Sequence, residues 1–429
     1  MTPQPASPHA PSYYAATAHR QDARAPLAGA ERADVCIIGA GFTGISAALE
    51  LAERGFSVIV LEGERVGFGA SGRNGGQMVN GYSRDLDVIA KRYGETAGRQ
   101  IAAMAMQGGQ IIRARVAKYA ISCDLTPGNM FTALTAKQMR GLEHHVKIWN
   151  QHGYTDFELL DRAGLARHVN TSRYSGGLID HRGGHLHPLN LVQGEAAAAE
   201  SLGARIFEGS RVISVSTGAN PVVKTAQGEV HAKFVIVSAN AYIGNLLPEI
   251  GGKIMPVSTQ VLATEPLGEA AAALLPSNLA VEDCNYFLDY FRRTADNRIL
   301  YGGGTVYGAQ DSASIRAKII PSMLKTFPSL QHARIDFSWS GNFALTLTRF
   351  PQMGRLSPTV YYSHGDSGHG VTTTHLLGRI LGEAIAGQAE RFDIFASLPY
   401  YPFPGGKTLR VPLTVLGSWY YRLRDKVGI

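Results

Sequence analysis

A glycine-rich segment near the N-terminus has the spacing of a phosphate-binding turn. Residues 39–44 read Gly-Ala-Gly-Phe-Thr-Gly, the pattern Gly-x-Gly-x-x-Gly. In such a turn the first glycine makes the bend, the second admits a pyrophosphate, and the third lets helix and strand pack. Glu62 follows about 20 residues on, where an acid accepts hydrogen bonds from ribose hydroxyls and disfavours a 2′-phosphate. The pattern predicts a dinucleotide site made of Gly39, Ala40, Gly41, Phe42, Thr43, Gly44 and Glu62.

A second glycine cluster follows that acid directly. Residues 67–81 contain six glycines in fifteen positions, a density that suits backbone lying against an extended ligand. A nicotinamide dinucleotide does not require such a second loop, so the cluster favours a flavin dinucleotide. Arg73 offers a forked donor, and Ser71, Asn74 and Gln77 offer hydrogen bonds to the rest of the cofactor. The alternative is a flexible surface loop. The residues expected to bind the cofactor are Gly69, Ala70, Ser71, Arg73, Asn74, Gly75, Gly76 and Gln77.

An aromatic segment supplies candidates for a substrate pocket. Residues 285–292 read Asn-Tyr-Phe-Leu-Asp-Tyr-Phe-Arg, and alternation in a strand places Tyr286, Leu288, Tyr290 and Arg292 on one face. Tyr290 is a candidate wall of the pocket, and the fork of Arg292 matches the two oxygens of a carboxylate. Packing in the core or between domains is the competing interpretation for each of them.

Four histidines are further candidates. His364 and His369 lie in a glycine-rich loop, where an imidazole can move a proton or present positive charge. His185 and His187 are two residues apart, but no carboxylate or thiol cluster joins them, so we expect no metal site. Structural hydrogen bonding is one interpretation of this pair.

The length and composition of the chain indicate what kind of protein must position these residues. A chain of 429 residues favours two domains. The formal charge is +7, yet the basic residues are scattered, so nucleic-acid binding is not expected. The three cysteines lie far apart, which indicates a reducing cytoplasm. We find no secretory signal and no apolar stretch long enough to cross a membrane.

The order of apolar segments predicts an α/β architecture. Residues 35–38, 45–54 and 56–61 are typical of strand, helix and strand, and further strands are expected at 203–207, 211–215 and 233–239. Residues 95–118 indicate one helix. Segments 256–264 and 286–301 alternate apolar with polar residues, which favours an antiparallel sheet. Because the two kinds of segment are interleaved, we expect discontinuous domains.

Two segments of the sequence resemble a known family. The stretch Ala-Ser-Gly-Arg-Asn-Gly-Gly-Gln at 70–77 and the segment Asp-His-Arg-Gly-Gly-His-Leu-His-Pro at 180–188 are similar to the D-amino-acid oxidase superfamily of FAD oxidoreductases, and within it to the gamma-glutamylputrescine oxidase branch. The resemblance runs from about residue 12 to residue 406. It implies a Rossmann-type FAD-binding domain with a second, α+β substrate domain whose antiparallel sheet roofs the flavin.

The same resemblance assigns boundaries and further cofactor residues. The FAD domain would comprise 33–115, 185–253 and 336–405, and the substrate domain 116–184 and 254–335. Residues 1–32 would be a lead-in and 406–429 a basic, aromatic tail, which we expect to pack as a helix on the body rather than to rest on a membrane. Additional FAD contacts implied are Val212, Ala239, Asn240, Tyr242, Gly341, Gly365, Gly368, His369, Gly370, Val371 and Thr372. The resemblance also implies a place beside the flavin for His187, which makes it a further candidate for the active site.

The implied reaction is oxidation of a small amine, of the polyamine or gamma-glutamyl-polyamine type, with oxygen reduced to hydrogen peroxide. The imine formed would hydrolyse to an aldehyde and ammonia. Some family members attach FAD to a cysteine in the region matching 339–346, but no cysteine lies there, so we expect non-covalent FAD. The lysine that sarcosine oxidases place near the flavin is absent from the matching residues 298–302. Two alternatives remain open: a D-amino-acid or imino-acid dehydrogenase that uses a quinone or other carrier, and a non-catalytic flavin-binding protein.

Overall fold

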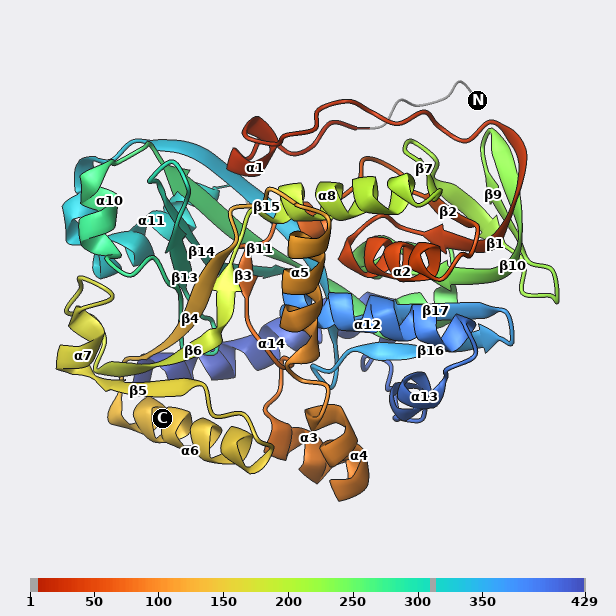
Figure 1. The fold of residues 1–429 in the computed structure, drawn as a ribbon. Helices are drawn as coiled ribbons and strands as arrows, with labels where there is room; N and C mark the ends of the chain where they lie inside the picture. The colour runs from red at the N-terminus through yellow and green to blue at the C-terminus, as the bar shows by residue number, and fades with distance from the viewer. Residues whose placement is uncertain (1–6, 309–313, 428–429) are drawn as a thin grey trace.

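Two large sheets lie side by side and organise the protein (Figure 1). The computed structural model describes residues 7–308 and 314–427, and the side chains of residues up to 420. Strands of the two sheets alternate along the chain, so each sheet is built from distant segments. The expected class is confirmed: a Rossmann-type α/β unit beside an α+β unit built on a mainly antiparallel sheet.

The first sheet has a parallel centre. β1 (Gly29–Ile38) pairs in parallel with β10 and β2, and β10 pairs in parallel with β17. The ends of β1 and β2 are continuous runs of buried apolar residues, as expected for parallel strands covered on both faces. The remaining strands of this sheet are β2 (Val58–Leu61), β7 (Arg205–Phe207), β8 (Val212–Val215), β9 (Val222–Thr225), β10 (Gly228–Val237), β16 (Gln352–Ser357) and β17 (Val360–His364).

The helices that cover this sheet pack closely against one another at small residues. A Cβ on Gly378 of α12 would lie 2.5 Å from the Cβ of Ser46 in α2, so the two helices approach closely. A buried ionic group fixes two more helices to α12: Arg115 donates to Glu195, and the Glu195 carboxylate pairs with His375. These helices are α2 (Phe42–Glu53), α5 (Gln107–Lys118), α8 (Pro188–Ser201) and α12 (Gly370–Ile385), with α13 (Glu390–Ala396) at the edge.

The second sheet is antiparallel apart from one parallel pair, β12 with β4. Its order is β15-β11-β14-β13-β12-β4-β6-β3, with β5 on β6. The strands are β3 (Gln77–Met78), β4 (Thr126–Ala133), β5 (Phe157–Asp161), β6 (Gly176–His185), β11 (Ile254–Thr264), β12 (Ala280–Asp283), β13 (Tyr290–Arg293), β14 (Ile299–Tyr307) and β15 (Ile335–Thr346). The helices around it are α6 (Ala136–Gln151), α7 (Arg162–Ala166), α9 (Pro248–Gly251), α10 (Glu269–Leu274) and α11 (Ile315–Thr326).

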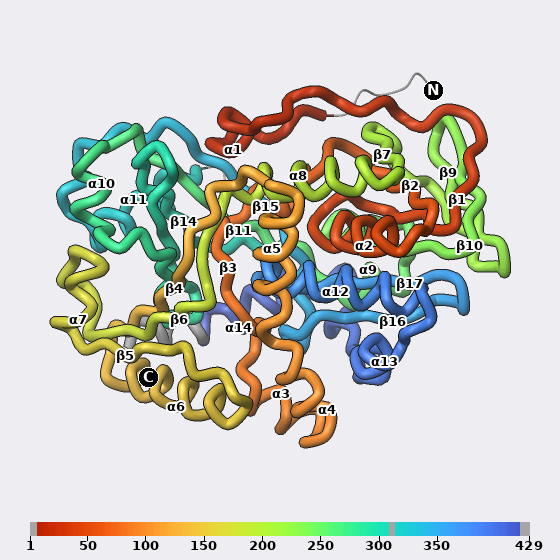
Figure 2. Tube along the Cα trace, in the orientation of Figure 1, coloured from red at the N-terminus to blue at the C-terminus, as the bar shows by residue number. Residues whose placement is uncertain are grey.

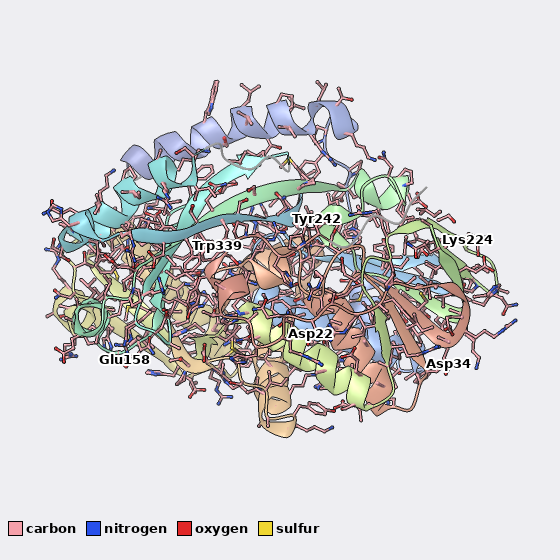
Figure 3. All side chains as sticks on the ribbon, turned by 90° about the horizontal axis from the view of Figure 1, so that it is seen from above. Asp22, Asp34, Glu158, Lys224, Tyr242 and Trp339 are labelled. Atoms are coloured by element: carbon pink, nitrogen blue, oxygen red, sulfur yellow. The ribbon has the colours of Figure 1, made fainter. Side chains whose placement is uncertain are left out.

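Both ends of the chain pack on this body. Figure 2 shows the N-terminal segment running to α1 (Tyr13–Ala16) and back along the top of the molecule to β1. Tyr14 is fully buried there, so this segment packs on the body of the protein. At the other end α14 (Gly406–Val427) lies along one side in Figure 3, with Val411 against Gly308 and Ser418 buried.

Two predicted elements differ from the structure. The single helix expected at 95–118 is two helices, α4 (Glu95–Ala102) and α5, because residues 103–106 turn between them; α3 (Leu86–Tyr93) precedes both. The expected strand 286–301 is regular only at β13 and from Ile299, because 284–289 bends at the cavity described below. None of the described helices is both long and apolar enough to cross a membrane.

Candidate active site

A long cavity of about 810 Å³ lies between the two sheets. One end is lined by the carboxyl ends of β1 and β2, where an open parallel sheet binds its ligands. The other end is lined by β11, β12, β13 and β14 of the second sheet. In Figure 3, Tyr242 and Trp339 mark the middle of the molecule from two different elements, the short 3-10 helix at Asn240–Tyr242 and β15.

The glycines at 39–44 have the close contacts that the fingerprint predicts. Gly39 has φ +100°, and a Cβ on it would lie 3.0 Å from the Ser238 carbonyl oxygen. A Cβ on Gly44 would lie 2.0 Å from the Gly39 carbonyl oxygen, so only glycine lets α2 approach the turn. The N–H groups of the first turn have no partner within a helix, and Phe42 and Thr43 line the cavity. This end of the cavity therefore suits a pyrophosphate.

Glu62 is held in place by backbone donors. Its carboxylate accepts hydrogen bonds from the N–H of Ala40 at 2.8 Å and of Glu64 at 2.9 Å. Burial raises the pKa of Glu62, and these two donors oppose that shift. Val212 and Arg211 line the same end of the cavity, and Arg211 donates to Glu64. An acceptor fixed beside the phosphate turn is the arrangement expected for an adenosine ribose.

The loop at 69–77 is glycine-rich mainly because other parts of the protein press against it. A Cβ on Gly75 would lie 2.6 Å from the ring of Tyr290, and one on Gly76 would lie 2.2 Å from the Leu186 carbonyl oxygen. Asn74 bonds within the loop, and Gln77 donates to the Val281 carbonyl. Protein contacts thus explain much of the density that the sequence attributes to a ligand.

Two polar atoms on the cavity wall lack protein partners. The buried Nε of Arg73 and the buried Oδ1 of Asn342 have no hydrogen bond in the part of the chain that the structure describes, and both residues line the cavity. Gly341, the residue before Asn342 on β15, lies close to Arg73, because a Cβ on Gly341 would lie 2.9 Å from the Cβ of Arg73. Such unsatisfied groups are costly unless a ligand pairs with them.

A third loop, at 365–369, reaches the cavity from the end of β17. Gly365 has φ +80° and Gly368 has φ +97°, so both need the freedom of glycine. Asn240 joins this loop to the middle of the cavity: its Nδ2 donates to Asp366 at 2.8 Å, and its Oδ1 accepts from the Gly365 N–H at 3.0 Å. α12 then begins at Gly370, and its first residues line the cavity.

The candidate catalytic residues separate into two groups. Tyr290 and His369 line the cavity. His369 precedes α12, and burial lowers the pKa of its imidazole to about 4, so it is neutral at pH 7. The ring of Tyr290 lies between Gly75 and Gly302, and burial raises its pKa well above the usual value. A neutral His369 offers hydrogen bonds rather than positive charge.

The structure places the other three candidates away from the cavity lining. His364 is buried, stacks on Tyr362, and pairs with Gln352 at 3.1 Å. His187 accepts from the Asn190 N–H at the start of α8 and contacts Thr17. Arg292 donates to the carbonyls of Gly75 and Leu186 and to the hydroxyl of Tyr14. Each side chain is committed to protein partners.

Two residues that the sequence did not single out lie on the cavity wall. Arg349 is half-buried, donates from Nη2 to the Tyr286 hydroxyl at 2.5 Å, and lies over that ring. Its φ of +60° is unusual outside glycine and gives no signal in the sequence. Glu282, on β12, is buried, and burial raises the pKa of its carboxyl to about 8. Only the folding of β12 beside β13 brings it to the cavity.

Metal chemistry finds no support among the described residues. No three His, Cys, Asp or Glu side chains of the described chain gather as metal ligands. None of the three cysteines lines the cavity. The donor set instead fits FAD: a turn for pyrophosphate, a fixed ribose acceptor, unsatisfied Arg73 and Asn342, and the start of α12.

Comparison with known proteins agrees with this geometry. The family model described as "DAO: FAD dependent oxidoreductase" matches residues 34–384. Gamma-glutamylputrescine oxidoreductase of Escherichia coli is 53% identical over 98% of this chain and 99% of its own length. The resemblance noted at 70–77 and 180–188 is thus confirmed. The chain belongs to this FAD-dependent oxidoreductase family, and FAD is its cofactor.

Solved structures share the fold. Glycine oxidase from Geobacillus kaustophilus aligns with a TM-score of 0.73 at 21% identity, covering 86% of this chain and all of that one. L-proline dehydrogenase from P. horikoshii aligns with a TM-score of 0.73 at 20% identity, covering 85% and 96%. At these identities the likeness concerns the fold alone.

Proposed function

We propose that this FAD-dependent oxidoreductase oxidises the primary amine of a gamma-glutamylated polyamine. The C–N bond becomes an imine, water hydrolyses the imine to an aldehyde and ammonia, and O₂ takes up the two electrons as hydrogen peroxide. Support comes first from the relative that is 53% identical over nearly its whole length and is named for gamma-glutamylputrescine. The aligned region spans 98% of this chain, so it includes the segments that form the cofactor loops and the cavity walls.

The observation that carries the proposal is that a basic group and an acidic group both line the cavity. Arg349 supplies a guanidinium, and Glu282 supplies a carboxyl group, beside the aromatic rings of Tyr286, Phe287 and Tyr290. A gamma-glutamyl-polyamine carries a carboxylate at one end, an apolar methylene chain, and an amine at the other end. These groups match a fork for a carboxylate, apolar walls and an acidic partner for the amine.

FAD, when bound, supplies the two-electron acceptor for the amine. The protein positions the amine and excludes water. Arg349 holds the carboxylate end, with Tyr286 orienting the guanidinium through its hydroxyl. The rings of Phe287 and Tyr290 cover the methylene chain. The N–H groups at the start of α12 present positive potential where negative charge accumulates on reduction.

A substrate comparison tests the proposal. The purified yellow protein is mixed without oxygen with gamma-glutamylputrescine, putrescine, sarcosine and D-alanine, and the loss of flavin absorbance is timed. We expect gamma-glutamylputrescine to reduce the flavin far faster than the others, at a rate that rises from pH 6 to pH 9, because only the neutral amine donates hydride. Preferred turnover of D-alanine would overturn the substrate class, and failure of every amine would favour a non-catalytic flavin protein.

Two further measurements sharpen the result. Readmission of oxygen should restore the yellow colour and release peroxide; recovery only with an added quinone would assign a dehydrogenase instead. Arg349→Lys should raise KM for gamma-glutamylputrescine about tenfold or more, since a lost charged hydrogen bond has that effect, and should change KM for putrescine little. Arg355→Lys, in an exposed ion pair with Asp393, is the matched control and should leave both unchanged.

A further inference from the structure

Glu282 lines the cavity, and its carboxyl group has no protein partner among the residues that the structure describes. It is 7% exposed, and in the described part of the chain no hydrogen bond or ion pair reaches its side-chain oxygens. Its backbone is fixed, because Glu282 pairs with Tyr290 on one side and Phe131 on the other. The side chain lines the cavity, so its carboxyl group is available to a ligand there, and an acid in such surroundings favours a cationic group opposite it.

The direction of this side chain follows from the register. Cross-strand neighbours of an antiparallel pair point to the same face, so Glu282 and Tyr290 share the face that meets the loop at Gly75. The next residue, Asp283, points to the other face, where Arg173 lies 3.5 Å away and also bonds Asp289. The two adjacent acids thus have different surroundings, because Asp283 faces a cation and Glu282 faces the cavity.

We propose that Glu282 binds the ammonium group of the substrate and accepts one of its protons, so that the amine is neutral when it is oxidised. This rests on the proposed function. The step is balanced: the ammonium N–H bond breaks, the proton moves to a Glu282 oxygen, and a neutral amine faces a neutral carboxyl group. No electron moves in this step, so it requires no further reactant.

Two other buried acids of the cavity wall already accept hydrogen bonds from the protein: Glu62 from the N–H groups of Ala40 and Glu64, and Asp366 from Asn240 and the Gly368 N–H. Further ionisable groups near the cavity do not fill this role either. Tyr290 on β13 holds its proton, because burial raises its pKa. His369 before α12 is neutral, with a pKa lowered to about 4. Arg73 and Arg349 are cations, and Asp283 on β12 itself faces Arg173. Burial and the neighbouring Asp283 raise the pKa of Glu282 to about 8, which suits a group that takes a proton from an amine near neutral pH.

The first test measures binding without oxidation. A gamma-glutamyl ligand that ends in a trimethylammonium group cannot lose a proton, and its neutral tert-butyl analogue has the same shape. Calorimetry on the FAD-loaded protein should show the cation binding about tenfold tighter at pH 9 than at pH 6, following ionisation of Glu282. Glu282→Gln should weaken cation binding to the level of the neutral analogue and remove its pH dependence.

The second test uses the pH profile of kcat/KM. The productive state in the native protein combines ionised Glu282 with the ammonium, so the profile should be a bell between about 8 and about 10, the pKa of a free amine. In Glu282→Gln only the free neutral amine reacts, so the profile should rise to a plateau near pH 10. Asp283→Asn is the control: it removes a buried acid on the other face, so the profile should stay a bell, with its acid limb at lower pH because Asp283 helps to raise the pKa of Glu282.

The outcomes separate this inference from the function on which it rests. Reduction by gamma-glutamylputrescine together with unchanged cation binding in Glu282→Gln would overturn the role of Glu282 alone. A fall in FAD affinity without a change in cation binding would do the same, by assigning Glu282 to the cofactor. Absence of amine oxidation would refute the proposed function, whereas the calorimetric result would still report on the cation site.

Discussion

Substitution of Gly44 by alanine tests whether close packing of α2 on the phosphate turn holds the cofactor site together. An added Cβ would lie 2.0 Å from the Gly39 carbonyl oxygen and 2.7 Å from Oγ of Ser238. The first contact is with backbone, which cannot rotate away, so α2 must shift relative to β1. In a helix, alanine is favoured over glycine by about 1 kcal/mol. Forced overpacking costs about 1–3 kcal/mol or more.

The expected net result is a loss of stability of about 1–2 kcal/mol and a larger loss of FAD retention, because the shift moves the first-turn N–H groups. The midpoint temperature of thermal unfolding, followed by circular dichroism, should fall by roughly 2–4 °C for each kcal/mol of stability lost. Gly141→Ala is the matched control: Gly141 lies within α6, and a Cβ there meets nothing within 4 Å. That variant should gain up to about 1 kcal/mol. If Gly44→Ala melted as high as Gly141→Ala and kept its FAD, the packing argument would be refuted.

Four further predictions concern the cofactor and the buried charges. Glu62→Ala should weaken FAD binding by about 1.5–3 kcal/mol in titrations of the apoprotein, since it removes a fixed charged acceptor; unchanged affinity would contradict the ribose role. Acid precipitation should leave the flavin in the supernatant, and a yellow pellet would show a covalent bond. Arg292→Lys should cost about 1–3 kcal/mol of stability, because two buried carbonyls lose the guanidinium that donates to both. It should change KM for gamma-glutamylputrescine and for putrescine equally. A selective effect on gamma-glutamylputrescine would show that Arg292 binds its carboxylate. Finally, the pKa of Glu282 is raised from 4.5 to about 8 in the folded protein, so its contribution to apoprotein stability is present below pH 4.5 and is lost as pH rises through 8. Urea unfolding should therefore show that Glu282→Gln gains stability relative to the native protein between pH 6 and pH 9. Parallel curves of unfolding free energy against pH for the two proteins would contradict the shift.

The cofactor end of the cavity could be predicted from sequence because its chemistry is local. A turn, a helix start and an acid at the end of the next strand lie within residues 39–62, and steric rules for glycine connect that pattern to one backbone path. The loop at 69–77 was predicted for the same reason, whereas the cofactor contacts at 365–372 were implied by the family resemblance. Even so, the sequence could not tell that Gly75 and Gly76 are required by Tyr290 and the Leu186 carbonyl.

The substrate end was decided only by tertiary structure. Alternation along 286–292 placed Arg292 beside Tyr290, and both lie on β13, but Arg292 donates to the carbonyls of Gly75 and Leu186 and does not line the cavity. Arg349 does line the cavity, and its positive φ is a feature that no periodicity in the sequence reveals. Glu282 reaches the cavity wall because β12 pairs with β4, a strand more than a hundred residues earlier in the chain. Local patterns determine where the backbone can bend and what its turns can bind, whereas the identity of the groups that share a cavity depends on which distant strands become neighbours.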